Sequence, residues 1–203
     1  FKQKTAYEIR NCDWSSDVCS SDLKDKGFHF LDGPVSGGQA GAESGKLTVM
    51  LGGDDAAFKK AEPIIACYSQ KAKLLGGPGS GQLTKMMNQM CIAGTVQGLA
   101  EALNFGINAG LNIDDVVETI SKGAAQSWQM DNRSKTMVID KFDYGFAVDW
   151  MRKDLKIAME EAKRNGSPVP ITTMIDGFYA EVQKMGGNRW DSSSLIALLK
   201  KKK

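Results

Sequence analysis

Lys85 lies where a side chain could carry acid–base chemistry. It falls in the first turns of a predicted long helix, directly after the glycine-rich stretch 76–83, and its neighbours on that helix face are apolar. We expect the apolar surface and the positive end of the helix to lower the pKa of Lys85, which would suit it to proton exchange near neutral pH. Asn88 and Gln89 follow on the same helix, where either amide could hydrogen-bond a bound carbonyl or hydroxyl group. The alternative is a lysine whose stem packs on methionines while its ammonium group reaches water.

The segment DGPVSGG at 32–38 could bind an anion. A predicted strand ends there in Ser36, Gly37 and Gly38, whose backbone N–H groups are not obstructed by large side chains. Successive N–H groups of this kind can form a concave nest that suits a carboxylate. The alternative is a tight turn between a strand and a loop, with no ligand.

Lys153 and Asp154 are a further charged pair, within the segment RKDL at 152–155. They fall in the middle of a predicted amphipathic helix over 147–165. On the residues alone, the expected state is a pair of solvated charges on the outer face of that helix.

The glycine-rich stretches do not match the loops of nucleotide-hydrolysing proteins. GGPGSGQL at 76–83 has glycines at the spacing of a P-loop, but Gln82 and Leu83 follow where phosphates and magnesium require a lysine and a hydroxyl residue. GAESGK at 41–46 has too few residues between its glycines. Neither stretch fits GxGxxG, so the sequence shows no phosphate fingerprint of a dinucleotide fold.

The composition excludes several other kinds of chemistry. The chain has 203 residues with 26 basic and 24 acidic side chains, a balance that favours neither nucleic acid nor a membrane surface as a partner. No apolar run approaches the roughly 18 residues of a membrane span. A single histidine, His29, argues against histidine-clustered metal sites, and the four cysteines have no metal-ligand spacing. We therefore expect a cytoplasmic protein that binds no metal, nucleic acid or membrane.

The predicted secondary structure that positions these residues changes near residue 80, from strands with one helix to helices alone. Short strands are predicted over 28–32, 46–53 and 71–76, with a helix over 56–66 that Asp54 or Asp55 can cap. From Ser80 the periodicity predicts one helix to about residue 109, long enough to link two domains. Further helices are predicted over 113–122, with Asn112 as its cap, and over 127–139, 147–165, 170–185 and 192–202.

Residues 1–23 do not share the patterns of the rest. They show neither helical nor strand periodicity, and Ser-Ser-Asp occurs in them twice. The segment resembles the translation of a sequencing-adapter read, and a disordered polar leader is the alternative. On the first interpretation, residue 24 is an internal position of a longer protein.

Four motifs occur in the order in which the β-hydroxyacid dehydrogenase family has them: DGPVSGG, GKLTVMLGG, GGPGSGQLTKMMNQ and RKDL. Residues 24–203 thus resemble the relatives of 3-hydroxyisobutyrate dehydrogenase. The resemblance implies an oxidoreductase that moves a hydride between NAD or NADP and a small carboxylate-bearing 3-hydroxy acid or its semialdehyde. It also implies an α/β remnant, the end of a Rossmann domain, over 24–79, followed by a long linking helix and an all-α C-terminal domain over 80–203. Family members usually assemble as homodimers or homotetramers.

The resemblance assigns roles to individual residues. Lys85 would be the catalytic acid/base, and Asn88 would orient the substrate. Gln89 is the alternative to Asn88, because the family places this amide three or four residues after the lysine. The backbone and hydroxyl donors of Ser36, Gly37 and Gly38 would hold the substrate carboxylate. The residues implied on the cofactor side are Gln39, Ala40, Phe146, Lys153 and Asp154.

One part of the family pattern is absent, namely the dinucleotide fingerprint that belongs near the N-terminus. With 1–23 in its place, we expect the chain as given to bind NAD(P) weakly or not at all, to be inactive alone, and to expose an unpaired sheet edge. Two alternatives remain for the function. One is an imine-reducing relative of the same fold, which typically lacks a lysine at position 85, and the other is a non-catalytic helical scaffold or reader.

Overall fold

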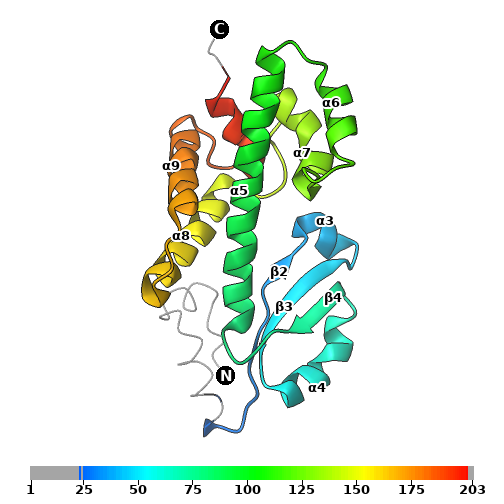
Figure 1. Cartoon of the computed structure of the whole chain (residues 1–203). Coiled ribbons are helices and arrows are strands. Elements are labelled where there is room, and N and C mark those ends of the chain that lie inside the picture. Colours follow the sequence, from blue (N-terminus) through cyan, green and yellow to red (C-terminus); the bar gives the residue numbers. More distant parts are fainter. Residues whose placement is uncertain (1–22, 24, 201–203) are drawn as a thin grey trace. The chain divides into compact units, whose positions relative to one another are not determined.

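The computed structural model describes residue 23 and residues 25–200 (Figure 1). Apart from residue 23, the segment 1–23 lies outside the described residues, so the predictions about it stay predictions. The chain divides into two compact units, one ending at Lys85 and the other beginning at Met86. Helix α5 (Ser80–Asn108) contributes residues to both.

A small sheet forms the centre of the first unit. Its long strand β3 (Leu47–Gly53) pairs antiparallel with β1 (Leu31–Asp32) and β2 (Val35–Ser36), and parallel with β4 (Ser69–Leu74). Val49 pairs with both Val35 and Ala72, so β2 and β4 lie on opposite edges of β3. Helix α4 (Asp55–Ile65) connects the two parallel strands, and a small apolar core forms from Leu47, Val49, Leu51 and Ile65.

The start of this unit differs from the prediction. The strand predicted over 28–32 is confined to β1, and the chain then forms β2 and a short helix, α3 (Gly38–Glu43), which was not predicted. Pro34 separates the two strands because it has no N–H to donate, although its carbonyl still accepts from the N–H of Met50 at 3.0 Å. Gly37, with a φ of 128°, turns the chain out of β2 into α3.

Helices form the second unit. The part of α5 from Met86 onward is followed by α6 (Ile113–Ile120), α7 (Trp128–Val138), α8 (Val148–Asn165) and α9 (Pro170–Lys184), and then by a short 3₁₀-helix, η1 (Ser192–Leu198). Helices α8 and α9 lie side by side (Figure 1). Fully buried side chains from different helices form the core, among them Val96, Met137, Leu155, Tyr179 and Ile196.

Local cap residues fix most helix ends close to their predicted positions. The side chain of Asn112 accepts hydrogen bonds from the N–H groups of Asp114 and Asp115, as predicted for a cap of α6. Gly166 ends α8 in the left-handed conformation, with a φ of 76°. Asp54 is the N-cap residue of α4, but its side chain makes no cap hydrogen bond. The predicted class, an α/β remnant followed by a long helix and a helical domain, is confirmed.

The helix predicted over 192–202 was wrong in kind. The described part of this segment is the 3₁₀-helix η1. Asp191 accepts from the N–H of Ser193, and Ser192, Ser193 and Ser194 are all buried. A buried anchor at the start of the segment therefore sets its conformation, rather than an apolar period of 3.6.

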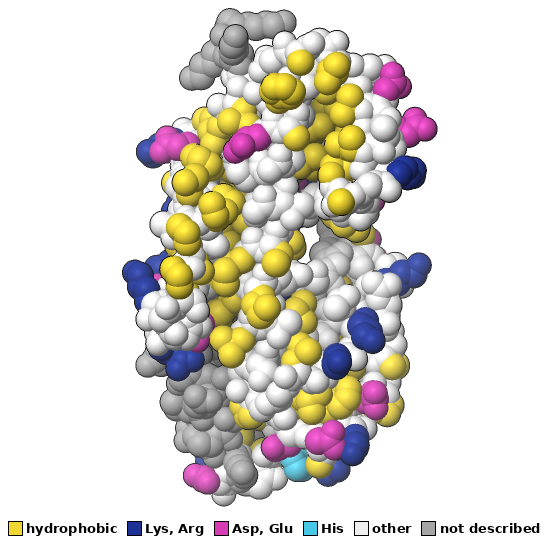
Figure 2. All heavy atoms as spheres, viewed as in Figure 1, with side chains coloured by type: hydrophobic (Ala, Val, Ile, Leu, Met, Phe, Trp, Pro, Cys, Tyr) yellow, Lys and Arg dark blue, Asp and Glu magenta, His cyan; other side chains and the backbone are white. Residues whose placement is uncertain are grey.

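The outward face of α5 has few charges. Lys85 and Glu101 are the charged residues of its sequence, whereas Met87 and Phe105 are 64% and 72% exposed. In Figure 2, hydrophobic and uncharged side chains dominate over this helix, and most charged side chains lie toward the edges of the view. A surface helix usually has its charged residues on the outer face, so this composition is unusual for a face in contact with water.

Candidate active site

Asp32 connects the two glycine-containing motifs of the first unit. Its carboxylate is buried and accepts the N–H of Gly79 at 2.7 Å through Oδ1 and the N–H of Gln82 at 3.0 Å through Oδ2. These N–H groups belong to the start of α5, where backbone donors have no partner within the helix. Asp32 therefore anchors the helix that carries Lys85 to the end of β1.

Two glycines allow this close approach. A Cβ atom at Gly81 would lie 2.4 Å from the carbonyl oxygen of Met50 and 2.6 Å from Oδ2 of Asp32. A Cβ atom at Gly52 would lie 2.5 Å from Oδ1 of Asp32. All three distances are too short for a real Cβ atom, so Gly81 of GGPGSGQL and Gly52 of β3 serve helix–sheet packing. This agrees with the absence of a P-loop pattern in the sequence.

Lys85 is half-buried in the second turn of α5 and is the last residue of the first unit. The predicted shift in its pKa stays a prediction. Because Asp32 holds the first turn of its helix, the position of the Lys85 backbone is set by a buried carboxylate rather than by a free helix end.

The segment predicted to bind a carboxylate turns sharply. Ser36 ends β2 and is half-buried, while Gly37 and Gly38 are exposed and have φ values of 128° and 60°. Gln39 and Ala40 form the first turn of α3 and are exposed, and the Gln39 amide donates to Glu43 at 2.7 Å. The positive φ angles explain why two glycines are needed here. The nest itself remains a prediction.

Four predicted residues of the second unit are joined by hydrogen bonds. Nδ2 of Asn88 donates to Oε1 of Gln89 at 2.8 Å, and Nε2 of Gln89 donates to Oδ2 of Asp154 at 2.7 Å. The other carboxylate oxygen of Asp154 lies 3.2 Å from Nζ of Lys153. The structure thus brings two residues of α5 and two of α8 into one polar chain.

The expectation of a solvated pair at 153–154 is therefore wrong for Asp154. Its side chain is 16% exposed and engaged on both oxygens, whereas that of Lys153 is 54% exposed. Arg152, the preceding residue, forms two hydrogen bonds with Asp176 of α9, each 3.0 Å long. These hydrogen bonds raise the pKa of Arg152. Leu155 is fully buried in the helical core. The consecutive residues of RKDL therefore contact α9 through Arg152, α5 through Asp154 and the core through Leu155.

Asp191 positions Phe146, a residue predicted on the cofactor side. Its Oδ2 accepts the backbone N–H of Phe146 at 2.8 Å, and its Oδ1 lies 3.4 Å from Nε of Arg133. The ring of Phe146 packs on Trp150, with 5.7 Å between ring centroids. Sequence reasoning missed both Asp32 and Asp191. The available signal was an aspartate directly before a turn or a run of small residues, DGP and DSSS.

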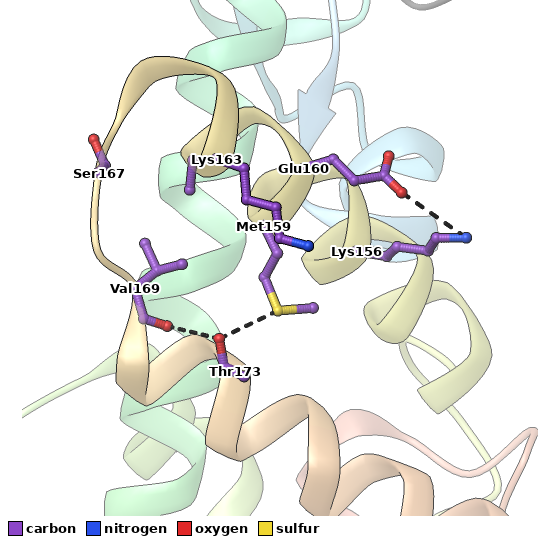
Figure 3. Close-up of a pocket in the computed structure, with 8 residues that line it drawn as sticks. Lys156, Met159, Glu160, Lys163, Ser167, Val169 and Thr173 are labelled. Atoms are coloured by element: carbon purple, nitrogen blue, oxygen red, sulfur yellow. Dashed lines mark hydrogen bonds and ion pairs between the residues drawn. The ribbon is translucent and has the colours of Figure 1, made fainter.

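The second unit also has a surface hollow. It is lined by the end of α8, the start of α9 and the segment between them: Lys156, Met159, Glu160, Ala162, Lys163, Ser167, Val169 and Thr173 (Figure 3). Figure 3 shows the Thr173 hydroxyl between the Val169 carbonyl and the Met159 sulfur, to both of which it donates. None of the predicted site residues lines the hollow.

Two kinds of feature are absent from the described residues. Within them, no group of three or more histidine, cysteine, aspartate or glutamate side chains is placed to hold a metal ion. Across the same part of the chain, no helix combines the length and the apolar character that a membrane crossing requires.

Comparisons with known proteins give consistent relatives. The family described as the NAD-binding domain of NADP-dependent 3-hydroxyisobutyrate dehydrogenase matches residues 79–199, and the NAD-binding domain of 6-phosphogluconate dehydrogenase matches residues 14–77. An uncharacterised oxidoreductase of Shewanella frigidimarina is 64% identical over 85% of this chain and 59% of its own length. The 2-(hydroxymethyl)glutarate dehydrogenase of Eubacterium barkeri is 35% identical over 91% of this chain and 64% of its own length.

A solved structure shows the same fold. The 3-hydroxyisobutyrate dehydrogenase of Mycobacterium tuberculosis, determined with L-serine, has a TM-score of 0.84 at 26% identity, over 92% of this chain and 66% of that one. The chain spans about three fifths of the length of the curated relatives it matches. On these matches, the chain belongs to the family of NAD(P)-dependent 3-hydroxyacid dehydrogenases related to 3-hydroxyisobutyrate dehydrogenase.

Proposed function

We propose that this chain is the catalytic part of a dehydrogenase that oxidises a small carboxylate-bearing 3-hydroxy acid, or reduces the matching semialdehyde, with NAD or NADP. The observation that supports this most is the Asp32 carboxylate, which joins the motif of the predicted carboxylate nest to the start of the helix that carries Lys85. This chain spans about three fifths of the length of its relatives. The activity is therefore proposed for a protein that also contains the part of the relatives that this chain does not match.

Lys85 acts as the base in the oxidation direction. Its neutral amine takes the proton of the substrate hydroxyl, the C–O bond becomes a carbonyl, and the hydrogen on that carbon leaves with both electrons. When bound, NAD or NADP supplies the acceptor for that hydride. In the reverse direction, the Lys85 ammonium gives its proton to the oxygen of the semialdehyde.

The substrate is held by its carboxylate and its hydroxyl. The N–H groups of the Ser36–Gly38 turn and the Ser36 hydroxyl bind the carboxylate, which fixes the reacting carbon relative to Lys85. Asn88 orients the hydroxyl from one turn further along α5.

We propose that Gln39, Ala40, Phe146, Lys153 and Asp154 lie on the cofactor side. Gln39 and Ala40 are exposed on the first turn of α3, whereas Asp191 accepts the backbone N–H of Phe146 and Trp150 packs against its ring. Lys153 and Asp154 form an ion pair whose ammonium is more than half exposed. Gln39, Phe146 and Lys153 would contact the cofactor through polar and aromatic groups that have partners of their own.

A chimeric enzyme tests this function. The N-terminal segment of the Shewanella frigidimarina relative would be joined ahead of residue 24, and a panel of 3-hydroxy acids offered with NAD and with NADP. We expect cofactor reduction that depends on a carboxylate in the substrate, with amide analogues turned over at least about 100-fold less efficiently. Equal turnover of acid and amide would contradict the carboxylate nest, and no turnover of any member would contradict the function.

We also propose that the complete protein assembles as a homodimer or homotetramer. The poorly charged outer face of α5, with Met87 and Phe105 exposed, supports association with a second copy. Self-association of this kind gives closed, symmetric oligomers.

A further inference from the structure

We propose that Gln89 is a positioning residue that fixes the amide of Asn88, and that Asn88 rather than Gln89 contacts the substrate. The proposal rests on the proposed function for the identity of the ligand. It rests on the structure alone for the hydrogen-bonded chain formed by Asn88, Gln89, Asp154 and Lys153, hereafter the relay.

Burial closes the Gln89 side chain to a ligand. The residue is only 2% exposed, its Oε1 accepts from Asn88, and its Nε2 donates to Asp154. Because this side chain is almost fully covered, a bound molecule could reach it only if the atoms around it moved. Asn88 is half-buried, and its carbonyl oxygen and second N–H are not used in the relay.

The carboxylate of Asp154 gives the relay its direction. An ionised carboxylate only accepts hydrogen bonds, so the Gln89 amide must turn its NH₂ group toward Asp154. Its oxygen then faces Asn88, which must turn its own NH₂ group toward Gln89. The Asn88 amide is thereby fixed in one of its two possible orientations, and that orientation follows from the chemistry of the carboxylate.

Lys153 completes the relay at its exposed end. Its ammonium lies 3.2 Å from the Asp154 oxygen that does not accept from Gln89, so both carboxylate oxygens have a partner. The consecutive residues 153 and 154 on α8 thus act on the amide of a residue on α5.

A fixed amide suits a hydroxyl ligand. Asn88 presents a carbonyl oxygen and one N–H in a set order, and a hydroxyl group can donate to the first and accept from the second. If the amide were free to rotate by half a turn, each orientation would be populated and part of the alignment would be lost. Gln89, Asp154 and Lys153 therefore contribute alignment to the reaction without touching the substrate.

Exchanging the two inner groups of the relay tests the proposal. In Gln89→Glu, two carboxylates face one another, and in Asp154→Asn, the amide of Gln89 loses the partner that fixes its direction. The double variant Q89E/D154N restores a complete chain, because Asn88 and the new amide at position 154 then both donate to the carboxylate at position 89. The net charge also returns to that of the unchanged chain.

The first measurement needs no activity. In the chain as given, we expect each single variant to lower the melting temperature by roughly 5–10 °C and the double variant to recover most of the loss. Additive losses in the double variant would overturn the relay. Glu101→Gln is the matched control, since it changes an amide–carboxylate pair of the same helix, Gln97–Glu101, outside the relay.

The second measurement uses kinetics of the chimeric enzyme. We expect each single variant to lower kcat/KM for the hydroxy acid by roughly 10- to 100-fold, the double variant to regain most of it, and Glu101→Gln to leave it unchanged. Asn88→Ala should lower kcat/KM similarly, with no recovery by the exchange. Thermal recovery without kinetic recovery would refute the role of the relay in substrate alignment. If the double variant regains its melting temperature but no variant of the chimeric enzyme turns over, the proposed function is overturned and the positioning of Asn88 by Gln89 is still supported.

Discussion

At the scale of single residues, three aspartates carry most of the positioning. Asp32 accepts two backbone N–H groups of α5, Asp154 accepts the Gln89 amide, and Asp191 accepts the N–H groups of Phe146 and Ser193. A carboxylate accepts in several directions and donates in none, so a buried one dictates which group of each partner must face it. Each of these aspartates thus fixes a residue that the proposed chemistry uses, and the proposal gives none of the three a part in the reaction itself.

Tyr179 gives a pH-dependent test at this scale. It is fully buried and donates to the Ser192 carbonyl at 3.0 Å. Burial raises the pKa of Tyr179 above its ordinary value of 10.0, and the negative charge of Asp191 raises it further. Below pH 10 the protonated side chain is present in both the folded and the unfolded states. Above it the unfolded chain loses this proton and the folded chain does not, so stability falls as the pH rises.

We therefore expect the free energy of unfolding to fall more steeply with pH in the unchanged chain than in Tyr179→Phe. The difference in slope should approach about 1.4 kcal/mol per pH unit above pH 10. Urea unfolding at several pH values between 8 and about 11 would measure it. Tyr68→Phe, which alters an exposed tyrosine of the first unit, is the control and should keep the original slope. Parallel slopes in the unchanged chain and Tyr179→Phe would contradict the argument.

At the scale of elements, the start of α5 is the most informative. Asp32→Asn keeps the size of the side chain but replaces one acceptor oxygen with an NH₂ group that faces a backbone N–H. We expect the opening free energy of the Gly79 and Gln82 amides to fall by about 2 kcal/mol, measured by hydrogen exchange. Asp54→Asn is the matched control, because Asp54 is an N-cap residue whose side chain makes no cap hydrogen bond. It should change the stability of α4 by less than about 0.5 kcal/mol.

The same scale shows how far sequence reasoning reached. Apolar periodicity and local caps such as Asn112 and Gly166 predicted the helices from α5 to α9, because their determinants lie within a few residues. Asp32 could not be assigned its role, because its two partners are 47 and 50 residues away. The 3₁₀-helix η1 was missed for a related reason, since the surroundings of Asp191 are built from α7 and the segment before α8. The spacing of Asn88 and Gln89 after Lys85 left two candidates, and the proposal in favour of Asn88 rests on the burial of Gln89 and its hydrogen bond to Asp154, which the sequence does not show.

At the scale of the whole molecule, the outer face of α5 predicts self-association. Phe105 is 72% exposed, so a charged residue there should not disturb the fold. We expect Phe105→Lys to shift the chimeric protein toward monomer by at least tenfold in dissociation constant, measured by light scattering after gel filtration. Ile139→Lys makes the same kind of change at a site of 68% exposure outside α5, and should leave the assembly unchanged. An unaltered mass for Phe105→Lys would exclude this face as the interface.

The central claim is that Lys85 exchanges the proton of the substrate hydroxyl, and Lys85→Ala in the chimeric enzyme tests it most directly. Removing an acid/base group should lower kcat by roughly 100- to 10,000-fold. The affinity for NADH or NADPH, measured by calorimetric titration, should remain within about twofold, because the proposal gives Lys85 no role in holding the cofactor. Lys156→Ala, an exposed lysine of α8, is the control and should leave both quantities unchanged. A Lys85→Ala enzyme that turns over its hydroxy acid at the unchanged rate would contradict the account.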